Sequence, residues 1–261
     1  MKGSIRFWWR IKGSYRRSPG EKIQAKKRNM GALCRINTVD YQGDENSIEG
    51  GGPMNLLREI EKYEPYNEQE SRDKNVMLGF LKNQKNVLTR ENEIAHFTAS
   101  AWVLNEARDK VLMIYHNIYD SWSWTGGHAD GEENLLAVAI KEVKEETGLI
   151  EVRPIQTEIF SLEILTVEGH LKNEKYVPSH LHINCTYLLE ASDDEKLSVK
   201  FDENQGVCWM DIETCVKVSK EPSMQKIYKK LNEKLRRYQL QNRKPSKKSN
   251  DSKDIICVDC F

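Results

Sequence analysis

Three glutamates at positions 142, 145 and 146 have a spacing that is suited to holding a metal ion. If this stretch is helical, separations of three and four residues place the three carboxylates on one face, about one turn apart. Like charges so close together repel one another, so the arrangement favours a site in which a cation lies between them. Carboxylate oxygens are ligands that Mg²⁺ and Mn²⁺ prefer. We therefore predict that Glu142, Glu145 and Glu146 bind Mg²⁺ or Mn²⁺.

The residues around these glutamates predict the helix that would position them. Leu136, Ile140 and Val143 recur at intervals of four and three residues and form an apolar stripe on another face. Gly148 follows, where a helix often ends in a left-handed conformation that glycine adopts readily. The sequence thus predicts a helix that is anchored in a core by one face, presents its acids on another and ends at Gly148.

The same stretch closely resembles the Nudix box, the pattern G-x5-E-x7-R-E-U-x-E-E-x-G-U in which U is an aliphatic residue. Gly127 opens the pattern, Glu133 follows after five residues, and Leu149 closes it, so that eight of the nine defined positions match. Lys141 stands where the family usually has Arg, which keeps the charge but loses the planar fork that holds a carboxylate in two places. By this resemblance Glu133 and Lys141 would brace the helix, Lys141 through an ion pair with one of the glutamates.

The resemblance also implies a fold, an activity and the roles of the acids. The fold would be α+β, the Nudix fold, with a mixed β-sheet sandwiched between helices in α/β/α layers. The activity would be a metal-dependent attack of water on a nucleoside diphosphate linked to a further group, which breaks the pyrophosphate bond. Glu142, Glu145 and Glu146 would be the metal ligands, the first two also catalytic, and Gly127 would shape the loop before the helix.

The general base is predicted outside this helix. Glu203 lies in a loop shortly before Trp209 and is the best loop acid to accept a proton from water, although an exposed acid before a strand is the other interpretation. Substrate is predicted to contact Gly127, the neighbouring His128 directly after the glycine pair, and Trp124, whose ring could stack on a base.

Other histidines and aromatic residues allow two interpretations. His180 and His182 alternate along a predicted strand and share one face, where neutral imidazoles could ligate a metal or contact phosphate, as could His170. Core or surface histidines are the simpler interpretation. Further aromatic side chains could stack on a planar group or only pack in a core: Trp102, Trp122 and Tyr187.

Periodicity along the chain predicts helices and strands on both sides of the box. A first helix with Leu56, Ile60 and Tyr63 on one face should end before Pro65, and a last helix should cover residues 222–240. Between them, apolar runs predict a second helix around residues 76–81, strands at residues 97–104, 111–115, 155–168, 181–189 and 206–210, and a polar loop at residues 169–178.

The composition fits a globular protein without a membrane span. Of 261 residues, 40 are Lys or Arg and 40 are Asp or Glu, and no apolar run approaches the length that crosses a bilayer. We predict a basic, disordered N-terminal extension at 1–53, a Nudix hydrolase domain with an N-terminal helical part at 54–240, and a disordered polar tail at 241–261. The extension could instead be a transit-like or nucleic-acid-binding arm, or sequence upstream of the true start, because Met30 and Met54 are alternative starts.

Six cysteines are scattered along the chain, which favours a reducing compartment and a cytoplasmic protein. Cys257 and Cys260 form a single C-x-x-C pair near the C-terminus. Without a second pair or nearby histidines, two free thiols are favoured over a zinc site. The predicted partner is a small phosphorylated substrate; no membrane and no nucleic acid are expected, and a homodimer is one option.

Two other functions share the predicted fold. Isopentenyl diphosphate isomerases have it and use a metal, Glu and Cys, but the one Cys before the box, Cys34, lies in the N-terminal extension. Non-catalytic nucleotide sensors commonly lose box acids, whereas all are present here. Residues 160–166 contain neither the Pro nor the Tyr of some subfamilies, which disfavours ADP-ribose and dinucleoside polyphosphates. A nucleoside triphosphate, a nucleotide sugar or a coenzyme A derivative remain as substrates.

Overall fold

The computed structural model describes residues 53–172 and 174–242. Its first elements are two helices, α1 (Pro53–Lys62) and α2 (Glu68–Asn83), at the two places where the sequence predicts N-terminal helices.

Both N-terminal helices belong to the folded core. Leu56 and Ile60 of α1 and Met77 of α2 are buried in one hydrophobic cluster with residues of the sheet. Asn67 caps α2, because its side chain accepts a hydrogen bond from the Glu70 N–H. The helices are therefore part of the structural unit that carries the box.

Eight strands form one mixed sheet. Its central order is β10-β2-β1-β9-β5, while β3, β4 and β6 pair with β2, β1 and β9 respectively. The central pair β1 and β9 is parallel, and the other neighbours are antiparallel. The strands of this sheet are β1 (Ala95–Leu104), β2 (Lys110–His116), β3 (Ser121–Ser123), β4 (Thr125–His128), β5 (Val152–Pro154), β6 (Ser161–Val167), β9 (His180–Ala191) and β10 (Asn204–Asp211).

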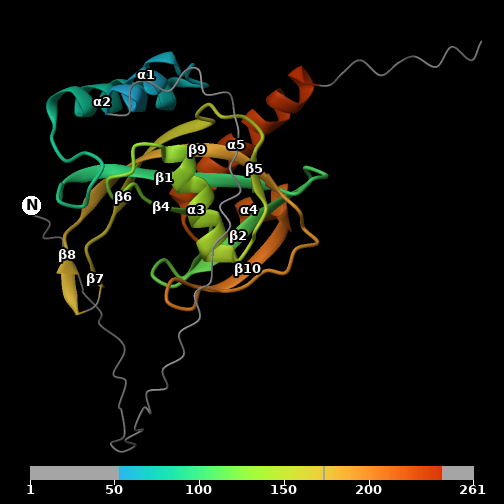
Figure 1. The fold of residues 1–261 in the computed structure, drawn as a ribbon. Coiled ribbons are helices and arrows are strands. Elements are labelled where there is room, and N and C mark those ends of the chain that lie inside the picture. Colours follow the sequence, from blue (N-terminus) through green and yellow to red (C-terminus); the bar gives the residue numbers. More distant parts are fainter. Residues whose placement is uncertain (1–52, 173, 243–261) are drawn as a thin grey trace, which may run out of the picture. The chain divides into compact units, whose positions relative to one another are not determined.

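Successive residues of β1 face two different hydrophobic clusters, because side chains alternate along a strand. Val103 belongs to the cluster to which α1, α2 and α3 (Leu135–Thr147) contribute, whereas Trp102 belongs to the cluster of α4 (Ile212–Val218) and α5 (Pro222–Gln241). Figure 1 shows α3 in front of the sheet, with α4 and α5 behind it. The sheet is therefore sandwiched between helices, which confirms the predicted fold class.

The structure corrects the sequence prediction between the box and β9. β6 begins at Ser161, so the predicted strand at 155–168 is too long; Phe160 is buried and its N–H bonds the Thr186 carbonyl, but the residues before it are not strand. The two isoleucines of this segment, Ile155 and Ile159, pack against the hydrophobic clusters without forming a strand.

The predicted polar loop at 169–178 is also wrong, because it contains a hairpin. β7 (His170–Lys172) and β8 (Lys175–Val177) form a separate two-stranded sheet. Leu171 and Tyr176 are both largely exposed, so the hairpin has no buried face that would show as alternation in the sequence.

Three short elements were not expected either: the helix α4 beside the sheet, and the strands β3 and β4 within it. α4 has seven residues, and Cys215 is the buried one among them, so it has no helical apolar stripe. β3 and β4 have three and four residues, and two of the residues in β4 are glycines, which are poor strand formers.

A buried group of charged residues joins α2 to α5. The Glu70 carboxylate lies 2.8 Å from Lys234 Nζ and 3.1 Å from Lys230 Nζ, and Lys230 also lies 3.0 Å from Glu163 on β6. Burial alone would raise the pKa of Glu70, but the charges of Lys234 and Lys230 outweigh it and lower the pKa to about 2. In this group each carboxylate has a cationic partner.

The predicted extension at 1–53 and tail at 241–261 lie outside the described residues, except for Pro53, Gln241 and Asn242. The C-x-x-C pair lies outside them as well. Within the described ranges, no helix combines the length and the apolar character that a bilayer crossing requires.

Candidate functional site

The three box glutamates lie on α3, and identifiable residues set both ends of this helix. Asn134 caps the N-terminus, because its side chain accepts a 3.0 Å hydrogen bond from the Ala137 N–H. Gly148 has a φ of 76° and donates its N–H to the Lys144 carbonyl at the other end. The predicted left-handed end at Gly148 is confirmed.

The apolar face of α3 is rotated from the predicted stripe. Leu136 and Ile140 are only partly buried, beside the cluster in which the core residues of α3 lie. Glu146 shares the buried face and is 3% exposed, whereas Glu142 is half-buried and Glu145 exposed. The acids therefore run from the core to the surface. The buried apolar residues of α3 are Leu135, Val138, Ala139 and Val143.

Two glycines of β4 allow its backbone to lie directly against these acids. The Gly126 N–H donates a 3.0 Å hydrogen bond to Glu146 Oε2. A Cβ at Gly127 would lie 2.5 Å from Glu142 Oε1, closer than real side chains come. The glycine pair therefore positions two of the three carboxylates by close backbone approach.

The loop before β10 adds a fourth acid to the group. Lys200 Nζ lies 2.9 Å from Glu203 Oε2 and 3.7 Å from Glu145 Oε2, so this lysine joins Glu203 to α3. The fully buried Asn204 donates a 2.9 Å hydrogen bond to the Glu146 backbone carbonyl. Glu203 is thus brought beside the box acids. Neither Lys200 nor Asn204 could be found by periodicity, because each acts across a long separation in sequence.

Negative charge outweighs positive charge in this acid group. Burial, and then the charge of Glu145, raises the pKa of Glu142. Burial raises the pKa of Glu146 well above its ordinary value, against the opposing effect of its bond to Gly126. Burial alone would lower the pKa of Lys200, but the acids beside it raise it. Crowded carboxylates of this kind fit a hard divalent cation such as Mg²⁺ or Mn²⁺.

The residues predicted to brace the helix lie at its surface. Lys141 Nζ is 3.7 Å from Glu145 Oε1, and both side chains are largely exposed, so this ion pair contributes little to stability. Glu133 is half-buried in the loop before α3.

The structure does not bring the predicted aromatic residues to the acids. Trp124 is 7% exposed and packs edge-on against Tyr228 of α5, with ring centroids 5.7 Å apart. Trp102 stacks on the same tyrosine, and Tyr187 is buried on β9. Trp122 is half-buried and lies edge-on to Tyr115. For Trp102 and Tyr187, packing in a core is the interpretation that holds.

His128 lies on the opposite face of β4 from the acids, because Gly127 faces Glu142 and side chains alternate. There it joins His180 and His182 of β9 and a fourth histidine, His96 of β1, which the sequence analysis did not single out. The ligand atoms of these four residues all lie within 4.8 Å of one another. Among the described residues, no second group of three or more His, Cys, Asp or Glu side chains, the acid group included, brings its ligand atoms together in this way.

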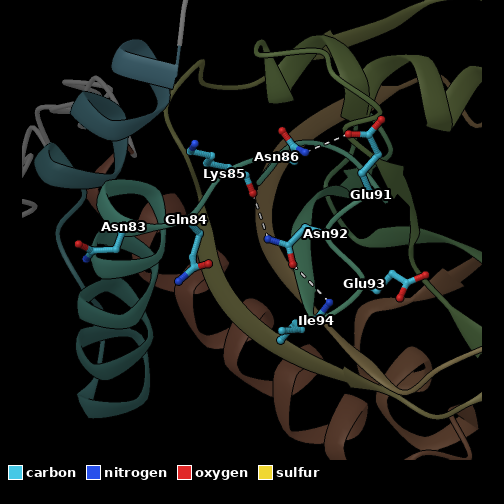
Figure 2. Close-up of a pocket in the computed structure, with 8 residues that line it drawn as sticks. All are labelled: Asn83, Gln84, Lys85, Asn86, Glu91, Asn92, Glu93 and Ile94. Atoms are coloured by element: carbon cyan, nitrogen blue, oxygen red, sulfur yellow. Dashed lines mark hydrogen bonds between the residues drawn. The ribbon is translucent and has the colours of Figure 1, made fainter.

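A shallow depression of 590 Å³ lies in the loop between α2 and β1 (Figure 2). It is lined by polar side chains and Ile94, and by no residue of the box. Asn86 and Glu91 are hydrogen-bonded to each other across it. The loop bonds to the box segment before α3, through Arg90 with Asp130 and through the Gly131 N–H with the Leu88 carbonyl. It also supports His96 through Asn92.

A family model described as NUDIX domain matches residues 94–231, which span β1 to α5 and include both the box and Glu203. A curated protein of Lactococcus lactis subsp. cremoris, named Probable DHNTP pyrophosphohydrolase, is 31% identical over 105 residues. The matched region covers 40% of this chain and 59% of that protein, so the chain spans less than two thirds of the relative's length.

Solved structures resemble the chain only distantly. The Caenorhabditis elegans Ap4A hydrolase in a binary complex has a TM-score of 0.39 and 17% identity, covering 54% of this chain and 97% of that chain. The Escherichia coli dihydroneopterin triphosphate pyrophosphohydrolase has a TM-score of 0.40 and 15% identity, covering 51% and 92%. At these values neither likeness bears on the activity of this chain.

Proposed function

Because the chain belongs to the Nudix hydrolase family, we propose that it hydrolyses the pyrophosphate bond of a nucleoside diphosphate linked to a further group, with Mg²⁺ or Mn²⁺ as cofactor. The observation that carries this proposal is the acid group that α3 and the loop before β10 form around Lys200. Family membership supports a small phosphorylated substrate.

Glu142, Glu145 and Glu146 would hold the cation. A divalent cation at this place supplies positive charge to phosphate oxygens and lowers the pKa of water. The chain's own contribution is to fix the ligands in advance: Glu146 accepts the Gly126 N–H, and Glu142 lies against the backbone of Gly127. Ligands that are held before the substrate arrives cost less reorganisation during the reaction.

Glu203 would act as general base and accept a proton from the attacking water. Lys200 Nζ lies 2.9 Å from Glu203 Oε2, and this ion pair holds the carboxylate beside the box acids, as the position of a general base requires. Because Lys200 also lies 3.7 Å from Glu145, one side chain contacts both the proposed base and a proposed metal ligand.

The remaining assignments stay predictions. Lys141 and Glu133 would brace α3, and Gly127 would shape the loop that enters the helix and contact substrate. Contacts of His128 and Trp124 with substrate require a ligand that reaches the opposite face of β4 or the edge of the α5 cluster. The division into an extension at 1–53, a domain at 54–240 and a tail at 241–261, a cytoplasmic location and a homodimer also stay predictions.

The name of the curated relative suggests where to look for the substrate. We propose a triphosphate on a bicyclic heterocycle, either a pteridine as in dihydroneopterin triphosphate or a purine, as the first class of compounds to test. Nucleotide sugars and coenzyme A derivatives are the further classes that the sequence leaves open.

The test is a hydrolysis assay on the full-length protein with these compounds, in Mg²⁺, in Mn²⁺ and in EDTA. We expect turnover of one class that depends on the divalent cation. Glu145→Gln should lower kcat by at least about 100-fold, because even outer-shell partners of a metal are worth 10- to 100-fold. Glu158→Gln, which alters an exposed acid outside the box, is the matched control and should leave kcat unchanged.

Turnover that survives both EDTA and Glu145→Gln would contradict the proposed role of the acids. Binding of compounds without hydrolysis would favour the sensor interpretation, and double-bond migration in isopentenyl diphosphate without phosphate release would favour the isomerase.

A further inference from the structure

Four histidines from three strands converge at one place in the sheet. His96 lies on β1, His128 on β4, and His180 and His182 on β9. The pairing explains the convergence: His96 is the register partner of His182 in the parallel pair, and Thr98, two residues further along β1, is the partner of His128. Residues two apart share a face of a strand, so all four imidazoles point to the same side.

The four rings are close enough to share a single ion. Their ligand nitrogens all lie within 4.8 Å of one another, and the Nε2 atoms of His180 and His182 are 3.1 Å apart. Zinc binds histidine nitrogen at about 2.1 Å, which in tetrahedral geometry separates the nitrogens by about 3.4 Å. Small side-chain rotations therefore suffice to bring the group to coordination distance.

Backbone carbonyls orient two of these rings as they do in metal sites. Nδ1 of His96 lies 3.0 Å from the Asn92 carbonyl, and Nδ1 of His180 lies 2.9 Å from the Pro178 carbonyl. A carbonyl oxygen can only accept, so Nδ1 carries the proton and Nε2 is left with its lone pair. Metal-bound histidines commonly have their second nitrogen fixed in this manner.

His96 shows the need for a further partner most clearly. The residue is 4% exposed, and its Nε2 is buried without a hydrogen-bond partner. Asn92, which holds the other nitrogen, is itself fixed in the loop before β1: its side chain donates to the Lys85 carbonyl and accepts the Ile94 N–H, as Figure 2 shows. The loop therefore holds His96 with an unsatisfied lone pair directed toward the other histidines.

The surroundings of His96 and His182 favour the neutral imidazole, the form that binds metals. Burial lowers the pKa of His96. Burial, and then the charges of His128 and the other histidines, lowers the pKa of His182 to about 2. The Nε2 atoms of His180 and His182 lie at hydrogen-bond distance, so a bound ion would replace one N–H···N bond between them.

We propose that His96, His128, His180 and His182 bind one transition-metal ion of the Zn²⁺ class, separately from the Mg²⁺ or Mn²⁺ of the acid group. Imidazole ligands suit Zn²⁺, Co²⁺ or Ni²⁺, whereas carboxylate oxygens suit Mg²⁺. Four protein ligands leave no open position in a tetrahedral site, so the ion would be structural. It would tie β1 and β9 to β4, the strand whose glycines lie against the box acids.

Spectroscopy of cobalt bound to the full-length protein tests this proposal. After removal of bound metals with a chelator, Co²⁺ is titrated in excess Mg²⁺, which occupies carboxylate sites. We expect one Co²⁺ per chain, intense visible absorption typical of four-coordinate cobalt, and loss of that absorption when Zn²⁺ is added. Metal analysis of the protein as purified should find zinc or a related ion.

Variants assign the site to the histidines. His182→Gln and His128→Gln should each weaken Co²⁺ binding by at least about 100-fold. His116→Gln removes a histidine outside the group and should bind as the parent does. The double variant Glu142→Gln with Glu145→Gln should retain the Co²⁺ spectrum, so a failure of the histidine site and a failure of the proposed hydrolysis are separately visible.

Two outcomes would overturn the proposal. One is a parent protein without four-coordinate Co²⁺ in excess Mg²⁺, and the other is a spectrum that persists in both histidine variants. If those variants do not fold, X-ray absorption on the parent decides the matter: nitrogen scatterers support the histidine site, and a shell of oxygens alone contradicts it.

Discussion

Two groups of glutamates in this protein differ in how their charge is balanced. Glu70 and Glu163 lie in the core with Lys230 and Lys234, so that the carboxylates and the ammonium groups are equal in number. The acid group on α3 and at Glu203 has Lys200 beside it and, beyond that, an exposed lysine on the helix surface.

The pKa values move in opposite directions in the two groups. The lysines lower the pKa of Glu70 to about 2, although burial opposes them, whereas burial and like charges raise those of Glu142 and Glu146. Balanced buried charge ties helices together, while unbalanced charge costs stability and leaves a place for a cation. The same residue type is thus structural in one group and suited to chemistry in the other.

The largest expected effect is on the balanced group. Glu70→Gln should lower the free energy of unfolding by about 3 kcal/mol or more, because it leaves two buried lysines short of a partner. Urea unfolding would measure this, with Glu68→Gln, an exposed acid on the same helix, as the control. The kcat of folded Glu70→Gln should stay near that of the parent. A loss below about 1 kcal/mol would show that the pairs are not structural.

Low pH should weaken the same ion pairs between Glu70 and the lysines of α5. A group whose folded pKa is lowered contributes stability above its unfolded pKa and loses it as the pH falls toward the folded value. For Glu70 this pH window runs from the ordinary pKa of 4.5 down to about 2. Across it the free energy of unfolding should decrease by about 3 kcal/mol, at roughly 1.4 kcal/mol per pKa unit. As the pH falls through this window, the free energy of unfolding should therefore decrease more steeply for the parent than for Glu70→Gln. Equal slopes would contradict the assigned pKa.

The next effect concerns the acid group. Gly127→Ala places a Cβ 2.5 Å from Glu142 Oε1, so the carboxylate or the strand must move. A displacement near 1 Å at a catalytic group can cost about 100-fold, and we expect a fall in kcat of that order. Gly79→Ala on α2 is the control, since nothing lies within 4 Å of its new Cβ and helix propensity favours alanine. Parent-like kcat in Gly127→Ala would mean that the close approach is not needed.

The smallest expected effect concerns Lys200, the lysine within the acid group. Lys200→Gln removes a cation that competes with the metal for Glu145 and Glu203, so the Mg²⁺ concentration at half-maximal rate should fall about fivefold, the scale of a partly exposed ion pair. Lys196→Gln, exposed in the same loop, should have no such effect. A higher Mg²⁺ requirement would mean that Lys200 organises the acids more than it competes for them.

Local sequence patterns predicted the helices and strands whose defining residues all lie within one short stretch of the chain. The box helix, its end at Gly148 and the last helix were found because apolar spacing, acids and a left-handed glycine all lie within one stretch of chain. The core face of α3 was placed one residue away, since Leu135 rather than Leu136 is buried. The hairpin at 169–178 was missed because its residues are exposed and so do not alternate.

The sequence by itself determined the fold class, through its resemblance to the Nudix box. It also determined that Glu142, Glu145 and Glu146 share a face, because a helix fixes which residues lie together. Tertiary structure alone decided which distant groups meet them. It placed Lys200 beside the acids and balanced Glu70 with lysines from α5. The register of β1 with β9 and β4, which no local pattern specifies, brought four histidines together on the other face of β4.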